Sequence, residues 1–106
     1  MTVERRRHIR YRHPLEAVWQ GASGASRCRL SDLSAGGCFV QSLATPASGE
    51  LTALTLSLGD GRLLAVTGRV AYVEPGMGFA IEFTGLADET RARLEQFLST
   101  RQRLAS

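Results

Sequence analysis

The 106-residue sequence has no lysine, only two cysteines and two histidines, and no long apolar run. No stretch approaches the roughly 18 apolar residues that cross a bilayer. The arginine-rich start is not followed by an apolar segment, so we expect no secretory signal and a cytoplasmic protein. Apolar residues make up 43% of the chain and charged residues 22%, which excludes intrinsic disorder and suffices for one domain with a modest core.

Cysteine and histidine are too scarce for the usual disulfide and metal scaffolds. Cys28 and Cys38 are separated by nine residues, and neither belongs to a C-x-x-C pair. With His8 and His13 they are nominally four zinc ligands, but their spacing does not favour zinc. We therefore predict no metal and two reduced thiols that act as small strand hydrophobes.

The common catalytic motifs are also missing. The sequence has no G-x-S-x-G, no H-E-x-x-H, no Walker loop and no G-x-G-x-x-G. Both histidines lie in a polar segment, away from any strand end that could hold a base rigidly. Nothing positions Ser34, Asp32 and a distant histidine as a triad. We predict that the protein is not an enzyme.

The positive charge that is present is concentrated in one segment. All 13 basic residues are arginines, and five of them lie within residues 1–13 against the single acid Glu4, giving that segment +4. The rest of the chain carries −1, so the net charge of +3 comes from this segment alone. We expect a flexible basic arm at 1–13 that serves one anionic site, because arginine pairs with phosphate and stacks on bases.

Short apolar alternations separated by turn residues fill the middle of the chain. Their period of two predicts six strands, at residues 15–20, 27–31, 38–40, 51–58, 62–73 and 77–83. Residues 32–37 are predicted to be an interruption between the second strand and the third. Gly68 is expected to mark a bulge or bend. Trp19 and Phe39 are predicted to be core residues, while Tyr11 and Tyr72 fit either face.

The last segment has a different period. From Asp88 to Leu104 the apolar residues follow helical spacing, which predicts a helix with Asp88 as its N-cap. Short strands without intervening helices favour an antiparallel sheet that closes into a barrel, with the helix covering it. The predicted fold is therefore mainly β, a six-stranded antiparallel β-barrel with one C-terminal α-helix, over residues 14–106.

Two polar sequence motifs are not explained by this fold. Residues 4–10 read E-R-R-R-H-I-R, with R-x-x-x-R at Arg6 and Arg10, and residues 32–37 read D-x-S-x-x-G. Later in the chain stand Gly68-Arg69-Val70 and Gly76-Met77-Gly78, the latter leading into Glu82-Phe83. In this order, over residues 4–100, these motifs resemble the PilZ domain, the bacterial family of cyclic di-GMP receptors.

This resemblance implies a fold, a ligand and a set of binding residues. The family has a six-stranded antiparallel barrel with a C-terminal helix, and it binds a cyclic dinucleotide with no further cofactor. In that family, an arginine at the position of Arg5 favours two intercalated ligand copies over one. The ligand-binding residues implied here are Arg5, Arg6, Arg10, Asp32, Ser34, Gly36, Gly37 and Gly78.

The chemistry of these residues fits such a ligand. The N1–H and amino group of guanine are donors that suit the carboxylate of Asp32, and its O6 and N7 acceptors suit an arginine fork. The Ser34 hydroxyl can donate to a phosphate. Gly36 and Gly37 permit close backbone approach and a positive φ.

We therefore expect a cytoplasmic bacterial receptor for cyclic di-GMP. The ligand would order the arginine arm, and the ordered arm would signal to an unidentified effector protein; the family implies control of motility and biofilm. One alternative is a ligand-blind PilZ adaptor, although its intact motifs argue against this. Another is a small nucleic-acid-binding barrel, which needs aromatic residues along an exposed strand face, and only seven residues are aromatic.

Overall fold

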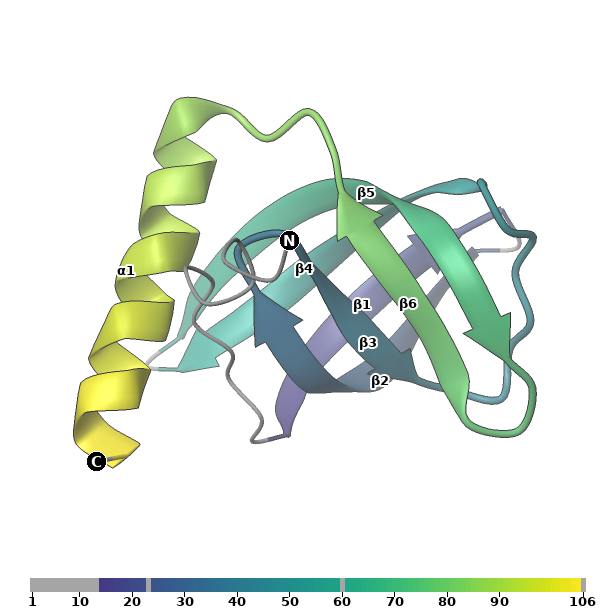
Figure 1. Ribbon diagram of the computed structural model, residues 1–106, viewed down its shortest axis with the longest axis horizontal. Coiled ribbons are helices and arrows are strands. Elements are labelled where there is room, and N and C mark those ends of the chain that lie inside the picture. Colours follow the sequence, from purple (N-terminus) through teal and green to yellow (C-terminus); the bar gives the residue numbers. More distant parts are fainter. Residues whose placement is uncertain (1–13, 23, 60, 106) are drawn as a thin grey trace, which may run out of the picture.

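The computed structural model describes residues 14–22, 24–59 and 61–105 of the chain (Figure 1). The predicted order of six strands followed by one helix is confirmed. The elements are β1 Leu15–Gly21, β2 Gly24–Ser34, β3 Gly37–Gln41, β4 Leu51–Gly59, β5 Arg62–Glu74, β6 Gly78–Phe83 and α1 Asp88–Ala105. The predicted basic arm, with Arg5, Arg6 and Arg10, lies outside the described residues.

The six strands form a closed barrel in the order β1-β2-β3-β6-β5-β4. Every neighbouring pair is antiparallel, and β1 closes the sheet by pairing with both β2 and β4. The predicted barrel is thus confirmed, and closure leaves these strands without a free edge. Within the described residues, no helix is both long enough and apolar enough to cross a bilayer.

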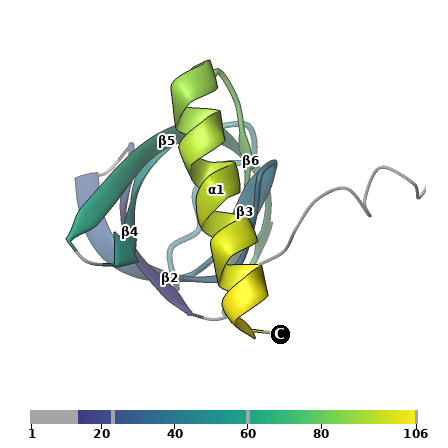
Figure 2. The ribbon, with the colours of Figure 1, turned by 90° about the vertical axis from the view of Figure 1, so that its left-hand side faces the viewer.

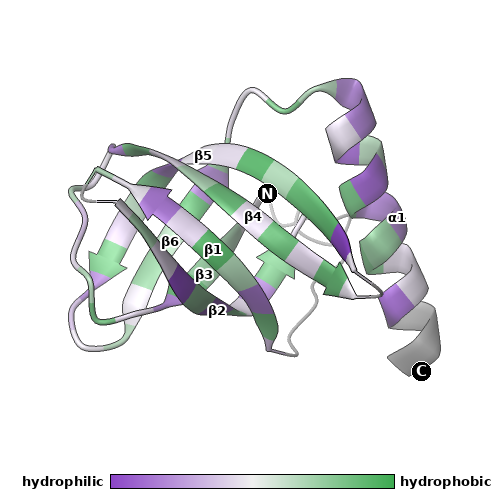
Figure 3. Ribbon diagram, turned by 180° about the vertical axis from the view of Figure 1, so that it is seen from behind, coloured by the Kyte–Doolittle hydropathy of each residue, from purple (hydrophilic) through white to green (hydrophobic). Residues whose placement is uncertain are grey.

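Alternating side chains fill the barrel. Along β4, Leu54, Leu56 and Leu58 are buried and the residues between them are half-buried, which gives the hydropathy alternation seen in Figure 3. Trp19 is buried, as predicted, and its ring lies 4.9 Å from that of Phe79, centroid to centroid.

One polar side chain is buried with this core. Thr52 accepts a hydrogen bond from the indole Nε1–H of Trp19, and its hydroxyl donates to the carbonyl of Gln20 at 2.8 Å. The donor of the indole and the acceptor on β1 are therefore both satisfied inside the barrel.

Helix α1 crosses one open end of the barrel (Figure 2). It buries Leu94, Phe97 and Leu98, the stripe predicted from helical spacing. The predicted N-cap is displaced by one residue. The Ala87 carbonyl accepts the first helical hydrogen bond, from Arg91 N–H at 2.9 Å, so Asp88 is the first helical residue.

Two expectations for the strands were wrong. Strand β2 continues to Ser34, so Asp32 and Ser34 lie on a strand rather than in an interruption, because the chain turns only at residues 35–36. No register shift occurs at Gly68. The irregularity in β5 falls between Val70 and Tyr72, and Gly68 serves a close approach, since a Cβ there would lie 2.5 Å from the Glu82 carbonyl oxygen.

Candidate functional site

Two β-bulges lie on one row of the barrel. The register of β2 against β3 shifts between Leu30 and Asp32, and that of β5 against β6 shifts between Val70 and Tyr72. Each bulge leaves two consecutive side chains outside the core, where a regular strand would leave one. Asp32 and Tyr72 thereby reach the outer face.

The strand register joins these two residues into a continuous row. Asp32 pairs with Phe39, Phe39 with Ala80, and Ala80 with Tyr72, across β2, β3, β6 and β5. The neighbouring outward row contains Ser34, Gly37, Glu82 and Arg69 in the same strand order. Residues from the D-x-S-x-x-G motif and from the late strands are therefore brought together on one face.

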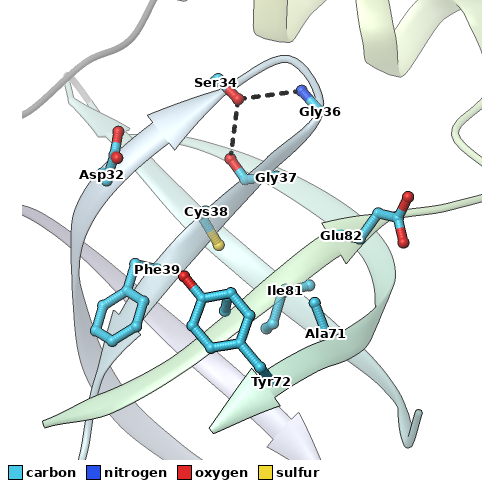
Figure 4. A pocket seen from close by; sticks show the side chains of 11 residues that line it. Asp32, Ser34, Gly36, Gly37, Cys38, Phe39, Ala71, Tyr72, Ile81 and Glu82 are labelled. Carbon is cyan, nitrogen blue, oxygen red and sulfur yellow. Dashed lines mark hydrogen bonds between the residues drawn. The ribbon is translucent and has the colours of Figure 1, made fainter. Parts of the chain in front are cut away.

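A pocket of about 230 Å³ opens between these rows, and we call it the outer-face pocket (Figure 4). The sequence-predicted residues Asp32, Ser34, Gly36 and Gly37 all line it. The remaining lining residues are Cys38, Phe39, Ala71, Tyr72, Ala80, Ile81 and Glu82. Figure 4 shows the two aromatic rings on one side of the pocket and the turn from Ser34 to Gly37 on the other.

The aromatic side of the pocket corrects the assignment of Phe39 to the core. Phe39 is half-buried on the outer face, because its neighbours Cys38 and Val40 occupy the inward positions of β3. Its ring centroid lies 6.5 Å from that of Tyr72, and Tyr72 is 51% exposed. The small Ala80 lies between them in the register, so the two rings form an aromatic wall accessible from solvent.

The turn that holds the motif is closed by the Ser34 side chain. Gly36 N–H donates to Ser34 Oγ at 3.3 Å, and Ser34 Oγ donates to the Gly37 carbonyl at 3.4 Å. The Gly36 carbonyl accepts from Phe83 N–H at 2.9 Å, which fastens the turn to the end of β6. The motif is thus held between two strands before any ligand binds.

The two glycines of this turn have different surroundings. Neither has a positive φ, so the left-handed backbone that glycine permits is not used at either position. Gly37 does provide close approach, because a Cβ there would lie 2.3 Å from the Ile81 carbonyl oxygen. A Cβ on Gly36 would meet nothing within 4 Å.

Gly78 is placed away from the pocket. It pairs with Gln41 on one side and Glu74 on the other, at the opposite end of β6, and it does not line the outer-face pocket. A Cβ on Gly78 would lie 2.0 Å from the Val40 carbonyl oxygen, so glycine there allows β3 and β6 to approach.

The pocket is acidic and unsuited to nucleophilic chemistry. Asp32 and Glu82 bring two carboxylates, and the Asp32 Oδ1 atom is buried. Burial raises the pKa of the Cys38 thiol well above its ordinary value, which keeps it protonated and inert at neutral pH. Burial likewise raises the pKa of Cys28 to about 11, and both cysteines are free thiols. The described residues contain no group of three side chains suited to a metal ion.

The family model of the PilZ domain matches residues 4–100. The chain belongs to the PilZ domain family. No relative is found among the curated proteins. The family is one of ligand receptors, and no catalytic family is indicated.

Solved structures share this PilZ fold at low sequence identity. The inhibitor of motility MotI/DgrA of Bacillus subtilis has a TM-score of 0.79 and 22% identity over 96% of this chain and 53% of its own. YcgR of Escherichia coli in complex with c-di-GMP has 0.79 and 20%, over 95% and 47%. The separate PilZ domain of YcgR with c-di-GMP has 0.78 and 18%, over 95% and 94%. The chain thus spans about half the length of MotI and of whole YcgR.

Sequence reasoning missed part of the outer-face pocket of this PilZ domain. The alternation along β3 could have placed Phe39 on the outer face, because Cys38 and Val40 flank it and occupy the inward positions. Nothing in the sequence located the bulge that turns Tyr72 outward. Ala80 and Glu82 become pocket residues only once β6 is paired between β3 and β5.

Proposed function

We propose that this PilZ domain is a receptor that binds cyclic di-GMP at the outer-face pocket. The observation that carries the proposal is that one pocket gathers a carboxylate, a hydroxyl, a glycine turn and two aromatic rings. YcgR, which has the same fold, holds c-di-GMP in its solved structures, and this supports the choice of ligand.

The proposed contacts follow from the chemistry of guanine. The Asp32 carboxylate accepts from the guanine N1–H and amino group, which are adjacent donors on one edge. The flat purine packs against the wall of Phe39 and Tyr72, since stacking on aromatic side chains is a general means of holding an unpaired base. The exposed Cα of Gly36 leaves room for the sugar–phosphate part to approach the turn.

The pocket alone is too small and too acidic for the whole ligand. A volume of about 230 Å³ is below the ~300–1,000 Å³ typical of sites that enclose a small molecule. Its charged lining residues, Asp32 and Glu82, are both acids. The two phosphodiesters therefore need cations from elsewhere, and Arg6 and Arg10 are proposed to supply them. Arg5 is proposed to favour a second, intercalated ligand copy.

Ligand binding would then order residues 1–13 against the barrel. Fixing about six residues costs roughly 6–12 kcal/mol, so the arginine contacts must be numerous and charge-assisted. The ordered arm is proposed to form or hide a surface for an effector protein, in the cytoplasm of a bacterium. Gly78 remains a predicted ligand residue, although it lies outside the pocket.

Calorimetric titration of the purified chain with cyclic di-GMP tests this proposal, with cyclic di-AMP as the control ligand. We expect saturable binding of cyclic di-GMP only, because adenine offers a bare N1 acceptor where guanine offers a donor to Asp32. Binding of both ligands with equal affinity would contradict the placement of the base. The stoichiometry distinguishes one ligand copy from two.

Asp32→Asn provides the sharper test of the site. Losing a charge-assisted hydrogen bond costs about 1.5–3 kcal/mol, so affinity should fall by roughly ten- to a hundredfold. Glu16→Gln is the matched control, because it removes one negative charge from an exposed position on β1. If Asp32→Asn binds as the wild type does, the proposed guanine contact is wrong. A folded chain that produces no heat at all favours the ligand-blind adaptor.

A further inference from the structure

A second cavity lies beside helix α1. It has a volume of about 230 Å³ and is formed between the helix and the β4–β5 hairpin. Figure 2 shows α1 running across the barrel opening, with β4 and β5 to one side and β3 and β6 to the other. This cavity and the outer-face pocket have no lining residue in common.

The lining of this cavity is basic. Arg62, Arg93 and Arg101 line it, together with the polar residues Gln96 and Thr100 and the ring of Phe97. No acidic side chain is among the described residues that line it. We refer to it as the arginine cavity.

Two of these arginines are held in place by the barrel. Arg93 Nη2 donates to the Leu63 carbonyl at 3.1 Å, and Arg101 Nη2 donates to the Leu58 carbonyl at 3.2 Å. The Arg101 guanidinium also lies 5.2 Å from the centroid of the Phe97 ring. Because a guanidinium has five N–H donors, each retains four after its carbonyl contact. The side chains are positioned, and most of their donors remain available.

The residues of α1 that face the cavity form one stripe. Positions 93, 96, 97, 100 and 101 repeat at intervals of three and four, so their side chains lie along the same side of the helix. Glu89 lies one turn before Arg93 on that side, and Glu95 lies on the opposite side. Within the part of the chain that is described, no carboxylate lies within 4.0 Å of the three arginines.

We propose that the arginine cavity binds a phosphate group. One arginine fork satisfies a carboxylate, whereas phosphate presents more oxygens and carries up to two charges, which several guanidinium groups can share. The Thr100 hydroxyl and the Gln96 amide add neutral donors beside them. The group can be inorganic phosphate or the phosphate of a monoester, since the cavity volume exceeds that of the bare ion.

The test is a titration of the ¹⁵N-labelled chain with inorganic phosphate, and separately with glycerol phosphate, at constant ionic strength. We expect saturable amide shifts in residues 93–101. The two ligands distinguish the sources, because an ester that binds more tightly than the inorganic ion identifies a phosphomonoester as the occupant. Shifts that rise linearly without saturation would overturn the proposal.

Two variants separate a site from general charge. Arg62→Gln should raise the midpoint for phosphate at least about fivefold, and it should fold, since the Arg62 side chain makes no hydrogen bond to the described residues. Arg91→Gln removes the same charge from an exposed position on the same helix that does not line the cavity, and should leave the midpoint unchanged. Equal effects of the two variants would overturn the proposal.

The arginine cavity is independent of the outer-face pocket. Asp32→Asn, which weakens the proposed cyclic di-GMP site, should not alter the phosphate midpoint. Arg62→Gln should in turn leave the cyclic di-GMP affinity unchanged. Failure of either binding reaction can therefore be told apart from failure of the other.

Discussion

Gly36 and Gly37 are adjacent in the sequence but have different structural requirements. A Cβ on Gly37 would press against the Ile81 carbonyl oxygen across the β3–β6 pair, whereas a Cβ on Gly36 would meet open space. We predict that Gly37→Ala lowers the free energy of unfolding by about 1–3 kcal/mol, the usual cost of overpacking. Gly36→Ala should change it by less than about 0.5 kcal/mol, as for an ordinary surface substitution. Urea unfolding of both variants measures the difference.

The same pair separates folding from binding. If the sugar–phosphate part of the ligand approaches the turn, Gly36→Ala should weaken cyclic di-GMP binding. The unfolding midpoint of this variant should stay that of the wild type. Equal stability losses in the two variants would contradict the packing described for β3 and β6.

Thr52 is the residue on which the polar contacts inside the barrel depend. Its hydroxyl satisfies both the Trp19 indole N–H and the Gln20 carbonyl. Thr52→Val keeps the shape of the side chain but removes both hydrogen bonds, so we predict a loss of about 1–3 kcal/mol in unfolding free energy. Thr52→Ser, which keeps the hydroxyl, is the control and should lose less. Chemical unfolding followed by Trp19 fluorescence reports both values, and equal losses would show that the methyl group matters as much as the hydroxyl.

At the scale of elements, helix α1 is attached to the barrel by a narrow apolar stripe. Leu94 is fully buried there, and its neighbours Phe97 and Leu98 are nearly so. We predict that Leu94→Ala costs about 2–5 kcal/mol, the range for a buried leucine that leaves a cavity. Leu51→Ala is the matched control, since Leu51 on β4 is 70% exposed and should change stability by less than about 0.5 kcal/mol. Thermal unfolding of the two variants is the measurement, and similar melting temperatures would mean that α1 does not stabilise the barrel.

The elements also show where prediction from the sequence ends. The alternation in β4 and the helical spacing of Leu94, Phe97 and Leu98 are local patterns, and both were correctly read. A bulge depends on the partner strand as much as on its own residues. The sequence suggested such a bulge at Gly68, which is instead a point of close contact with Glu82. The irregularity in β5 precedes Tyr72 and contains no glycine.

The candidate site was predictable to a similar extent. Asp32, Ser34, Gly36 and Gly37 were found because they form a motif within six residues. Tyr72 and Glu82 come from two other strands, β5 and β6, and their positions beside the motif depend on strand register, so the sequence alone did not identify them as pocket residues. Phe39 was misplaced because aromatic character alone favours the core, although its alternation with Cys38 and Val40 points outward.

At the scale of the whole molecule, charge is divided between two parts of the chain. Residues 1–13 carry +4, while the remainder carries −1 and presents two carboxylates at the outer-face pocket. A chain that has both a basic segment and an acidic, aromatic pocket fits a ligand that has both phosphates and hydrogen-bond donors. A long nucleic acid would instead require cations spread along its path.

This difference gives a prediction about salt. A cyclic dinucleotide has two phosphates and no condensed counterion layer, so the slope of log K against log salt should be shallower than about −1.5. A single strand that follows the five arginines of residues 1–13 would give a slope of about −3.5. Calorimetry with cyclic di-GMP between about 50 and 200 mM salt measures the slope, and a single-stranded oligonucleotide is the comparison. An oligonucleotide that binds more tightly than cyclic di-GMP, with the steeper slope, would favour the nucleic-acid-binding barrel, because only a polyanion releases that many counterions.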